Sequence, residues 1–446
     1  MSDRIARPAL LAFALSLTVS AAAFGGQASA LDVPAAKASV EKILDADYPH
    51  LDKLYKDIHA HPELAFQEAR TAALLAKEMR ALGYEVTEGV GKTGIVAVMK
   101  NGAGPTVMIR TELDGLPVEE KTGLPYASTA KQIYKGRESF VDHACGHDIH
   151  MAAWVGVARV MSTLKGKWHG TVVFVGQPAE EAIGGAKAMI ADGFMTRFPK
   201  PDMGFALHVG ADPYGEVHYR PGAWTSTADT LEILFKGRGS HGSMPEKSID
   251  PVLMASRFVV DVQSLISREK DPSEFGVVTI GTIQAGIAPN VIPDQARITG
   301  TIRTYDPAVR TRILAGIERT ANGEAMISGA PPPEIAPYND GATAVINDEA
   351  ITAKAGKVFS AAFGDKAIQA KRPGPASEDY SEFILAGIPS LAFGIGGSDP
   401  ELVKAGIAAG KPVPVNHSPY FAPVPEPTIK TGVKAMSLAV LNVLSK

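Results

Sequence analysis

The chain has 446 residues, of which 45% are hydrophobic and 21% are charged, and its formal net charge at pH 7 is −4. This composition excludes a disordered or collagen-like chain, and the length suits two or three domains. Because 44 Lys and Arg residues face 48 Asp and Glu residues, the charge balance also argues against a nucleic-acid binder, which usually carries a basic surface.

Residues 1–30 have the pattern of a signal peptide. Arg4 and Arg7 precede an apolar run over 9–24, and an Ala-x-Ala cleavage motif follows at 28–30. The run is shorter than the roughly 20 apolar residues that a membrane span needs, although an uncleaved anchor is the alternative. We therefore expect an exported protein, periplasmic or secreted, that starts near Leu31 and has no membrane partner after cleavage.

The next part of the chain alternates helices with short apolar strands. The helical pattern covers 36–60, 67–82, 148–164 and 186–191. The strand pattern covers 95–98, 107–109, 171–175 and 204–207. Continuous apolar strands between helices predict an α/β fold, with a sheet that helices cover on both faces.

The pattern changes after Gly222 and predicts a second, smaller domain. Strands and helices alternate there as 231–235 (strand), 251–267 (helix), 277–283 and 296–302 (strands), 307–321 (helix) and 334–335 (strand). This β-α-β-β-α-β order is typical of a ferredoxin-like α+β domain. The earlier alternation returns from Ala342 and ends in a helix over 427–444. We therefore expect a domain over 224–339, inserted into a larger one made of 31–223 and 340–446.

The segment Asp142–His150 (DHACGHDIH) is the strongest chemical signal, and it contains the one cysteine of the chain. Cys145 and His147 flank a glycine at a predicted helix N-terminus, where the pKa of a thiol falls and the metal-binding thiolate is favoured. A buried inert cysteine is the alternative, and a Cys–His nucleophile is a further one that this spacing suits poorly. In an oxidising compartment a free thiol needs burial or a metal.

Other candidate ligands follow strands of the same predicted sheet, whose carboxyl ends gather ligands in open α/β folds. Glu180 and Glu181 follow the strand at 171–175, and two adjacent carboxylates suit one metal ligand and one general base. Each candidate alone is commonplace. Together, one thiol, one carboxylate and three imidazoles could hold two divalent ions: Cys145, His147, Glu181, His208 and His417.

With these residues assembled, the sequence resembles a family of dinuclear metallopeptidases and amidohydrolases. That family includes aminoacylases, hippurate hydrolases, auxin-conjugate hydrolases and carboxypeptidase G. The resemblance extends over nearly the whole mature chain. The segments that carry it include RTELDGLPVEEKTGLPYAS (110–128), HACGHDIHMA (143–152), GQPAEEAIGGAKAMI (176–190), GSHGSMPEKSIDPV (239–252), SEDYSEF (377–383) and NHSPYF (416–421). It implies a zinc-exopeptidase-like catalytic domain with an inserted lid and dimerisation domain.

The resemblance also implies a role for each candidate ligand. Cys145 would bridge two divalent metal ions. His147 and His208 would complete one metal site, and Glu181 and His417 the other. Zinc or manganese suits such a donor set, and cobalt is a third candidate.

The resemblance also implies roles for residues that do not bind metal. Glu180 would take a proton from the attacking water and return it to the leaving nitrogen. Asp114 would orient the metal ligands. His241 would reach the active site of a second subunit and stabilise the oxyanion, with Asn290 nearby, and Arg303 would bind the substrate carboxylate.

One position departs from the family pattern. Glu112 stands where peptidase-type members have a metal-binding histidine and where the amidohydrolase branch usually has aspartate, so the pattern assigns it no role. His59, His61 and His150 lie in family-like segments, and we interpret them as structural.

These features together predict an enzyme that hydrolyses the amide bond of N-acyl amino acids or similar small conjugates, and that works as a homodimer. A carboxypeptidase or dipeptidase is the alternative within the same chemistry. Two further alternatives do not involve amide hydrolysis. One is an exported binding protein without activity, and the other is thiol redox chemistry at Cys145.

Overall fold

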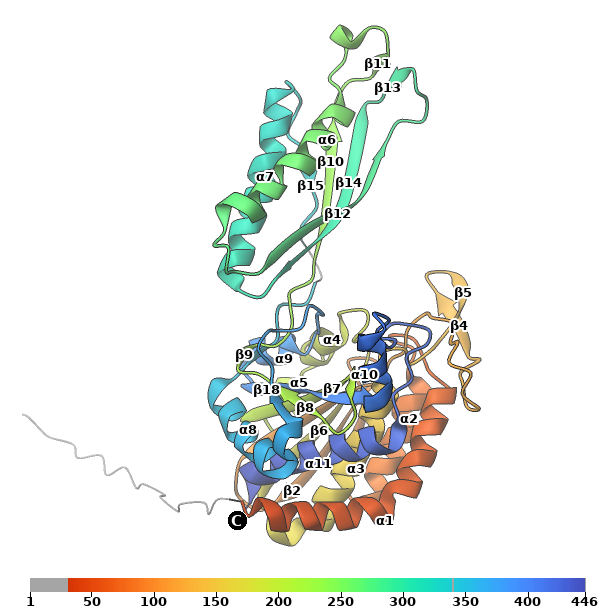
Figure 1. Cartoon of the computed structure of the whole chain (residues 1–446), viewed down its shortest axis with the longest axis vertical. Helices are drawn as coiled ribbons and strands as arrows, with labels where there is room; N and C mark the ends of the chain where they lie inside the picture. Colours follow the sequence, from red (N-terminus) through yellow and green to blue (C-terminus); the bar gives the residue numbers. More distant parts are fainter. Residues whose placement is uncertain (1–30, 339–340, 446) are drawn as a thin grey trace, which may run out of the picture.

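The computed structural model describes residues 31–338 and 341–445, and it has two bodies (Figure 1). The predicted signal peptide, residues 1–30, lies outside the described residues. Within those two ranges, no helix combines the length and the apolar character that crossing a bilayer requires.

The larger body is built on a mixed sheet of eight strands, as the α/β pattern predicts. Its central strands β3, β6, β7 and β18 run parallel, and β2 pairs antiparallel with β6. In sheet order the strands are β1 (Glu85–Val90), β2 (Gly94–Asn101), β6 (Gly170–Gln177), β3 (Thr106–Glu112), β7 (Met203–Pro213), β18 (Ser390–Ser398), β8 (Val217–Tyr219) and β17 (Ala367–Gln369).

Helices cover both faces of this sheet. One face packs on α1 (Val33–Ala60), α2 (Ala69–Ala81), α3 (His147–Thr163), α8 (Glu349–Phe363) and α11 (Pro425–Leu444). The other packs on α4 (Gly185–Ala191), α5 (Phe194–Arg197) and α9 (Ser381–Leu385). Along β2, Ile95 and Ala97 belong to the first core, whereas Val96 and Val98 belong to the second. Because successive side chains of a strand point to opposite faces, a continuous apolar run fills both cores.

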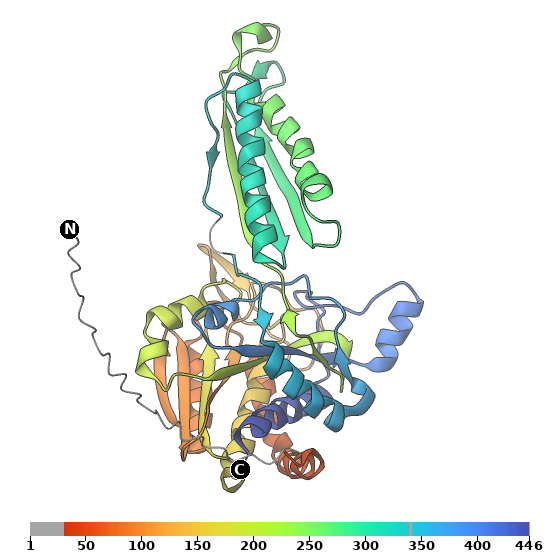
Figure 2. The same ribbon diagram turned by 90° about the vertical axis from the view of Figure 1, so that its left-hand side faces the viewer.

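The smaller body has the predicted ferredoxin-like topology and a core of its own. Its elements are β10 (Asp229–Lys236), α6 (Pro251–Asp261), β12 (Gly276–Ala285), β14 (Gln295–Thr304), α7 (Pro307–Ile327) and β15 (Glu334–Ile335). The antiparallel sheet has the order β12-β14-β10-β15, and both helices lie on one of its faces (Figure 2).

Two helix ends in this body differ from the sequence pattern. The helix expected to reach residue 267 ends at Asp261, and a π-helical turn over Leu265–Glu269 follows, which keeps Leu265 in the core. The helix expected to end near Ala321 continues to Ile327, because Ala325 extends its buried face.

Short strand pairs that the sequence pattern did not indicate complete the fold. The pair β9 (Gly222–Ala223) and β16 (Ile346–Asn347) joins the two segments that connect the bodies. The pair β11 (Ser240–His241) and β13 (Val291–Ile292) lies at the end of the smaller body that is remote from the larger one (Figure 1). A hairpin of β4 (Lys131–Tyr134) and β5 (Arg137–Phe140) projects from the larger body (Figure 1), and so does the exposed helix α10 (Pro400–Ala408) (Figure 2).

Candidate active site

The candidate ligands converge at one edge of the eight-stranded sheet. Cys145 lies two residues before the start of α3, Glu181 follows β6, His208 lies in β7, and His417 lies in the loop before α11. Cys145, Glu181, His208 and His417 line one cavity of about 690 Å³. The sequence therefore predicted correctly that these side chains meet, although up to 272 positions separate them (417 − 145).

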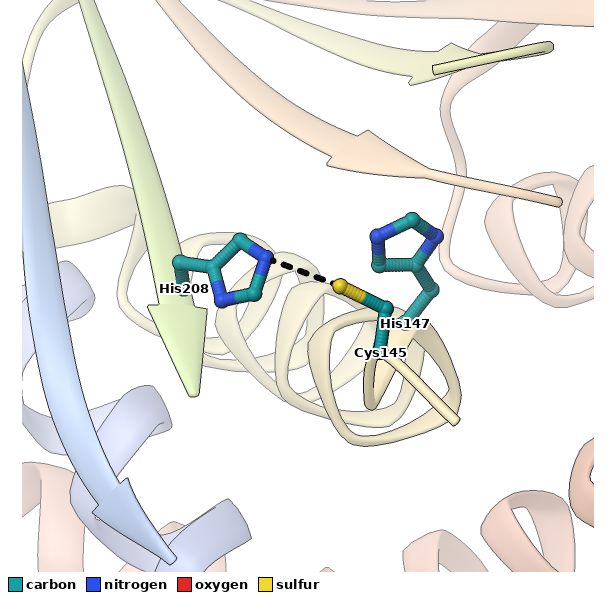
Figure 3. A group of neighbouring side chains, drawn as sticks. All are labelled: Cys145, His147 and His208. Carbon is teal, nitrogen blue, oxygen red and sulfur yellow. Dashed lines mark hydrogen bonds between the residues drawn. The ribbon is translucent and has the colours of Figure 1, made fainter. Parts of the chain in front are cut away.

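Cys145 belongs to two groups of neighbouring donor atoms. Its Sγ lies 3.4 Å from Nε2 of His208, and donor atoms of Cys145, His147 and His208 all lie within 4.8 Å of one another (Figure 3). Cys145, Glu181 and His417 form a second such group, in which Nε2 of His417 lies 3.5 Å from Oε1 of Glu181. A side chain that bridges two metal ions must lie next to the other ligands of both ions, as Cys145 does.

Gly146 permits this arrangement. It has a φ of 85°, and an added Cβ would lie 2.4 Å from Cγ1 of Val209. Only glycine adopts this left-handed conformation without cost and leaves that space open. The turn at Gly146 therefore lets Cys145 and His147 approach the same point from the start of α3.

The donor atoms fit metal ions. Nε2 of His147 and Oε1 of Glu181 are buried and have no hydrogen-bond partner within residues 31–338 and 341–445. Unpaired buried polar atoms are costly, and here they face a thiol and other imidazoles. Nδ1 of His147 donates to the Asp114 carbonyl at 2.8 Å, and Nδ1 of His208 to the Val209 carbonyl at 2.8 Å. Both imidazoles therefore carry their lone pair on Nε2, the atom that can ligate a metal.

The expected low pKa of the Cys145 thiol is wrong for the metal-free protein. Burial raises the pKa of Cys145 well above its usual range, and the nearby carboxylates of Glu181 and Glu180 raise it further. These effects outweigh the favourable field of the helix N-terminus. A thiolate at this position therefore depends on a neighbouring cation.

Glu180 lies beside the ligand cluster. Its Oε2 is 3.9 Å from Nε2 of His147. Burial raises the pKa of Glu180 well above its usual range, and the carboxylates of Glu378 and Glu181 add to the effect. A carboxyl group with a raised pKa can take up a proton and give it back near neutral pH, as a general base and acid must.

Asp114 holds the loop that carries Glu180 and Glu181. Its carboxylate accepts the backbone N–H of Glu180 at 3.0 Å and that of Glu181 at 2.9 Å, while its carbonyl accepts Nδ1–H of His147. These contacts are the ones that the predicted orienting role requires.

Glu112, to which the sequence pattern assigned no role, is buried and bound to two partners. Its carboxylate pairs with Arg110, and it accepts Nδ1–H of His150 at 2.8 Å. Nε2 of His150 in turn accepts the backbone N–H of Val209 at 2.8 Å. Glu112 therefore supports the middle of β7, where His208 lies next to Val209.

The sequence pattern missed several supporting residues. Arg110 is fully buried and donates to Glu378 at 2.7 Å and to Gln177 at 2.8 Å. The Asn416 amide donates to the carbonyls of Cys145 at 2.9 Å and Val209 at 3.0 Å, which seats the His417 loop. An arginine inside an apolar strand was a signal for a buried ion pair, but one of its carboxylate partners, Glu378, lies 268 residues away.

His59 is a buried cation beneath the site. Nδ1 lies 2.6 Å from Asp148 and Nε2 lies 3.2 Å from Glu120. Burial lowers the pKa of His59, but the hydrogen bonds and charges of these carboxylates outweigh it and raise the pKa to about 10. His61, by contrast, is exposed.

This pKa shift predicts a pH dependence of stability. A histidine with a pKa of about 10 in the folded state stabilises fully below its unfolded pKa of 6.5, and its contribution falls as the pH rises through about 10. We expect the His59→Gln variant to be less stable at neutral pH and to lack this alkaline decline in the free energy of unfolding. Urea denaturation at several pH values measures it. His61→Gln is the control, and equal slopes in wild type and His59→Gln would contradict the assignment.

Two of the predicted site residues lie away from the cavity of the same chain, and a third lines that cavity. His241 and Asn290 belong to the remote end of the smaller body, where the N–H of Gly242 donates to the Asn290 carbonyl at 2.8 Å. Arg303, from β14, lines the cavity together with Cys145, and its Nη1 donates to Oγ of Ser377 at 2.6 Å.

Comparisons with known proteins agree with this fold and site. The family model described as Peptidase family M20/M25/M40 matches residues 108–442. Hippurate hydrolase of Campylobacter jejuni is 38% identical over 352 residues, which cover 77% of this chain and 87% of that protein. A crystal structure from methicillin-resistant Staphylococcus aureus is 31% identical with a TM-score of 0.82, over 92% of this chain and 100% of that one. A Bacillus subtilis structure, described as a dinuclear metal binding peptidase from the M20 family, is 28% identical with a TM-score of 0.72, over 90% and 100%.

The fold and the site thus define a hydrolase that acts on amide bonds. The chain belongs to peptidase family M20/M25/M40.

Proposed function

We propose that this protein hydrolyses the amide bond of N-acyl amino acids with two divalent metal ions per chain. The observation that carries the proposal is Cys145, whose thiol is shared by two donor groups with Glu180 beside them. The hippurate hydrolase relative supports the substrate class, since hippurate is itself an N-acyl amino acid. The dinuclear Bacillus structure supports two ions.

The five candidate ligands, Cys145, His147, Glu181, His208 and His417, would hold the two ions. Divalent ions bound there would lower the pKa of a water molecule and polarise the amide carbonyl. Thiolate and imidazole donors favour zinc, and manganese or cobalt also suits a mixed nitrogen and oxygen site. Glu180 accepts the proton of the attacking water and delivers it to the leaving nitrogen.

The cavity offers different surroundings to the two parts of such a substrate. Trp224 contributes apolar surface that suits an acyl group, and the Arg303 guanidinium suits the carboxylate of the amino acid. Asp114 holds the loop that carries Glu180 and Glu181, and Arg110 binds Glu378. In this scheme neither residue contacts the substrate.

Arg303 tests the substrate orientation. We expect Arg303→Gln to raise KM roughly 10- to 100-fold with little change in kcat, because a charged hydrogen bond contributes about 1.5–3 kcal/mol to binding in ground and transition states alike. Arg297→Gln is the matched control, since Arg297 lies on the same strand and pairs with Glu232 on the surface. Steady-state kinetics on one N-acyl amino acid suffices, and an unchanged KM would exclude the role.

Metal analysis beside a substrate panel tests the function itself. We expect two divalent ions per chain in protein purified without chelator, loss of hydrolysis on chelation, and recovery with zinc or manganese. N-acyl amino acids should be cleaved faster than dipeptides. The reverse order would favour a dipeptidase, and activity that survives complete metal removal would overturn the mechanism.

We also propose that the smaller body forms a homodimer. Its outermost strand β12 carries the exposed Ile283, and α6 carries the exposed Leu253 and Val260. An unpaired strand edge beside exposed apolar side chains is a surface suited to a second copy of the chain. In a dimer, the remote His241 of one chain could reach the cavity of the other.

The local hydrogen bonds of His241 leave its Nε2–H as the donor of the ring. Its Nδ1 accepts the N–H of Ser243 at 3.1 Å, which places the ring proton of the neutral imidazole on Nε2. The side chain is exposed, so this N–H is available to the oxyanion of a neighbouring site.

Export is proposed from residues 1–30 alone. N-terminal sequencing of the protein recovered outside the cytoplasm should start near Leu31, and an intact Met1 there would contradict cleavage.

A further inference from the structure

The loop that carries Glu180 and Glu181 has a strained backbone. Between β6 and α4, Ala179 has a φ of 48° and Ile183 a φ of 50°. The chain also folds back tightly, since a Cβ added at Gly185 would lie 1.5 Å from the Pro178 carbonyl oxygen. Residues with side chains keep left-handed conformations only where surrounding contacts enforce them, and such positions cluster at active sites.

Buried carboxylates from three separate segments hold this loop. Asp114 binds the N–H groups of Glu180 and Glu181, and Asp379 accepts the N–H of Ala186 at 3.0 Å. Glu68 accepts the N–H of Ala179 at 2.7 Å, so it binds the strained residue itself. Glu68 precedes α2 and lies 111 residues from Ala179 in the sequence.

Glu68 is held in place by hydrogen bonds and is not part of the cavity that the candidate ligands line. Its side chain is fully buried, Oε1 also accepts the N–H of Phe66 at 2.9 Å, and Oε2 accepts the hydroxyl of Thr93. It does not line the cavity. Burying a carboxylate is costly unless it is well hydrogen-bonded, so a side chain that only filled space would be apolar.

We propose that Glu68 is a positioning residue for amide hydrolysis. It holds Ala179 in the left-handed conformation, which directs the next two side chains, Glu180 and Glu181, toward the cluster around Cys145. The inference rests on the proposed function, in which Glu180 is the base and Glu181 a metal ligand. Without the carboxylate, Ala179 relaxes to a right-handed conformation, and both side chains lose their direction.

The first test compares two substitutions of Glu68 with a matched control. Glu68→Leu removes the acceptors, and we expect kcat to fall roughly 10- to 100-fold with KM nearly unchanged. Metal affinity, measured by competition with a chelating dye, should fall as well, because Glu181 shifts. Glu68→Gln should stay close to wild type, since its amide oxygen still accepts the Ala179 N–H. Glu63→Leu is the control, because Glu63 binds the N–H groups of Arg70 and Thr71 at the start of α2 instead.

A glycine at position 179 separates positioning from general stability. Glycine adopts a positive φ without a side-chain penalty, so Ala179→Gly added to Glu68→Leu should restore most of kcat and of metal affinity. If Glu68→Leu fails to fold, Glu68→Asp takes its place, because the shorter side chain withdraws the carboxylate from Ala179. Unchanged kcat in Glu68→Leu (or in Glu68→Asp, where that replaces it), or a loss that Ala179→Gly leaves unrepaired, would overturn the proposal. A wild-type protein without metal or hydrolysis would instead overturn the proposed function.

Discussion

The Glu180→Gln variant should lose roughly 10³-fold in kcat while it keeps both metal ions. Glutamine has nearly the same shape as glutamate but cannot accept the proton of the attacking water. Because burial and the neighbouring carboxylates raise the pKa of Glu180, its ionised form destabilises the metal-free fold at neutral pH. The melting temperature of the metal-free variant should therefore equal or exceed that of wild type.

Kinetics, metal content and thermal melting together check this expectation. Glu181→Gln is the matched comparison: it removes an expected ligand rather than the base, so it should lose metal as well as activity. Near-normal turnover of Glu180→Gln, or loss of its metal, would remove Glu180 from the role of base.

The His241→Ala variant should lose roughly 100- to 1000-fold in kcat, although His241 belongs to β11, at the end of the smaller body that is remote from the larger one. The loss follows if the imidazole N–H stabilises the oxyanion in a second subunit. Mixed dimers of His241→Ala and Glu180→Gln chains should then regain activity, because one of their two sites combines an intact Glu180 with an intact His241.

The mixing experiment gives a quantitative expectation. In an equal mixture after subunit exchange, about half of the dimers are mixed, so activity should approach about a quarter of the wild-type value. Each variant treated alone is the control. If His241→Ala is inactive and mixing restores nothing, His241 does not act across a dimer.

The sequence predicted the fold well where local patterns and packing agree. Apolar strands such as 171–175 fill two cores at once, and the alternation of strands and helices over 224–339 determines the ferredoxin-like order. The remote pair β11 and β13 was not predicted, because two-residue strands carry no periodicity.

Part of the site was equally accessible from sequence. Cys145 and Glu181 follow from chemistry placed at a helix start and a strand end, whose positions the sequence pattern predicts. His208 was expected at the end of a strand over 204–207, but β7 continues to Pro213, so His208 lies within the strand. Glu68 and Arg110 did not follow, because their roles depend on partners more than a hundred residues away. The thiol pKa was mispredicted because local sequence shows the helix terminus but neither the depth of burial nor the carboxylates that surround it.

The β9–β16 pair links the two bodies, and each body keeps a separate core, so one can turn against the other while both interiors stay intact. Arg303 belongs to one body and Cys145 to the other. If Arg303 anchors the substrate carboxylate as proposed, the angle between the bodies sets the distance from that carboxylate to the amide bond, and the amino-acid part that fits becomes a property of the hinge rather than of the pocket walls.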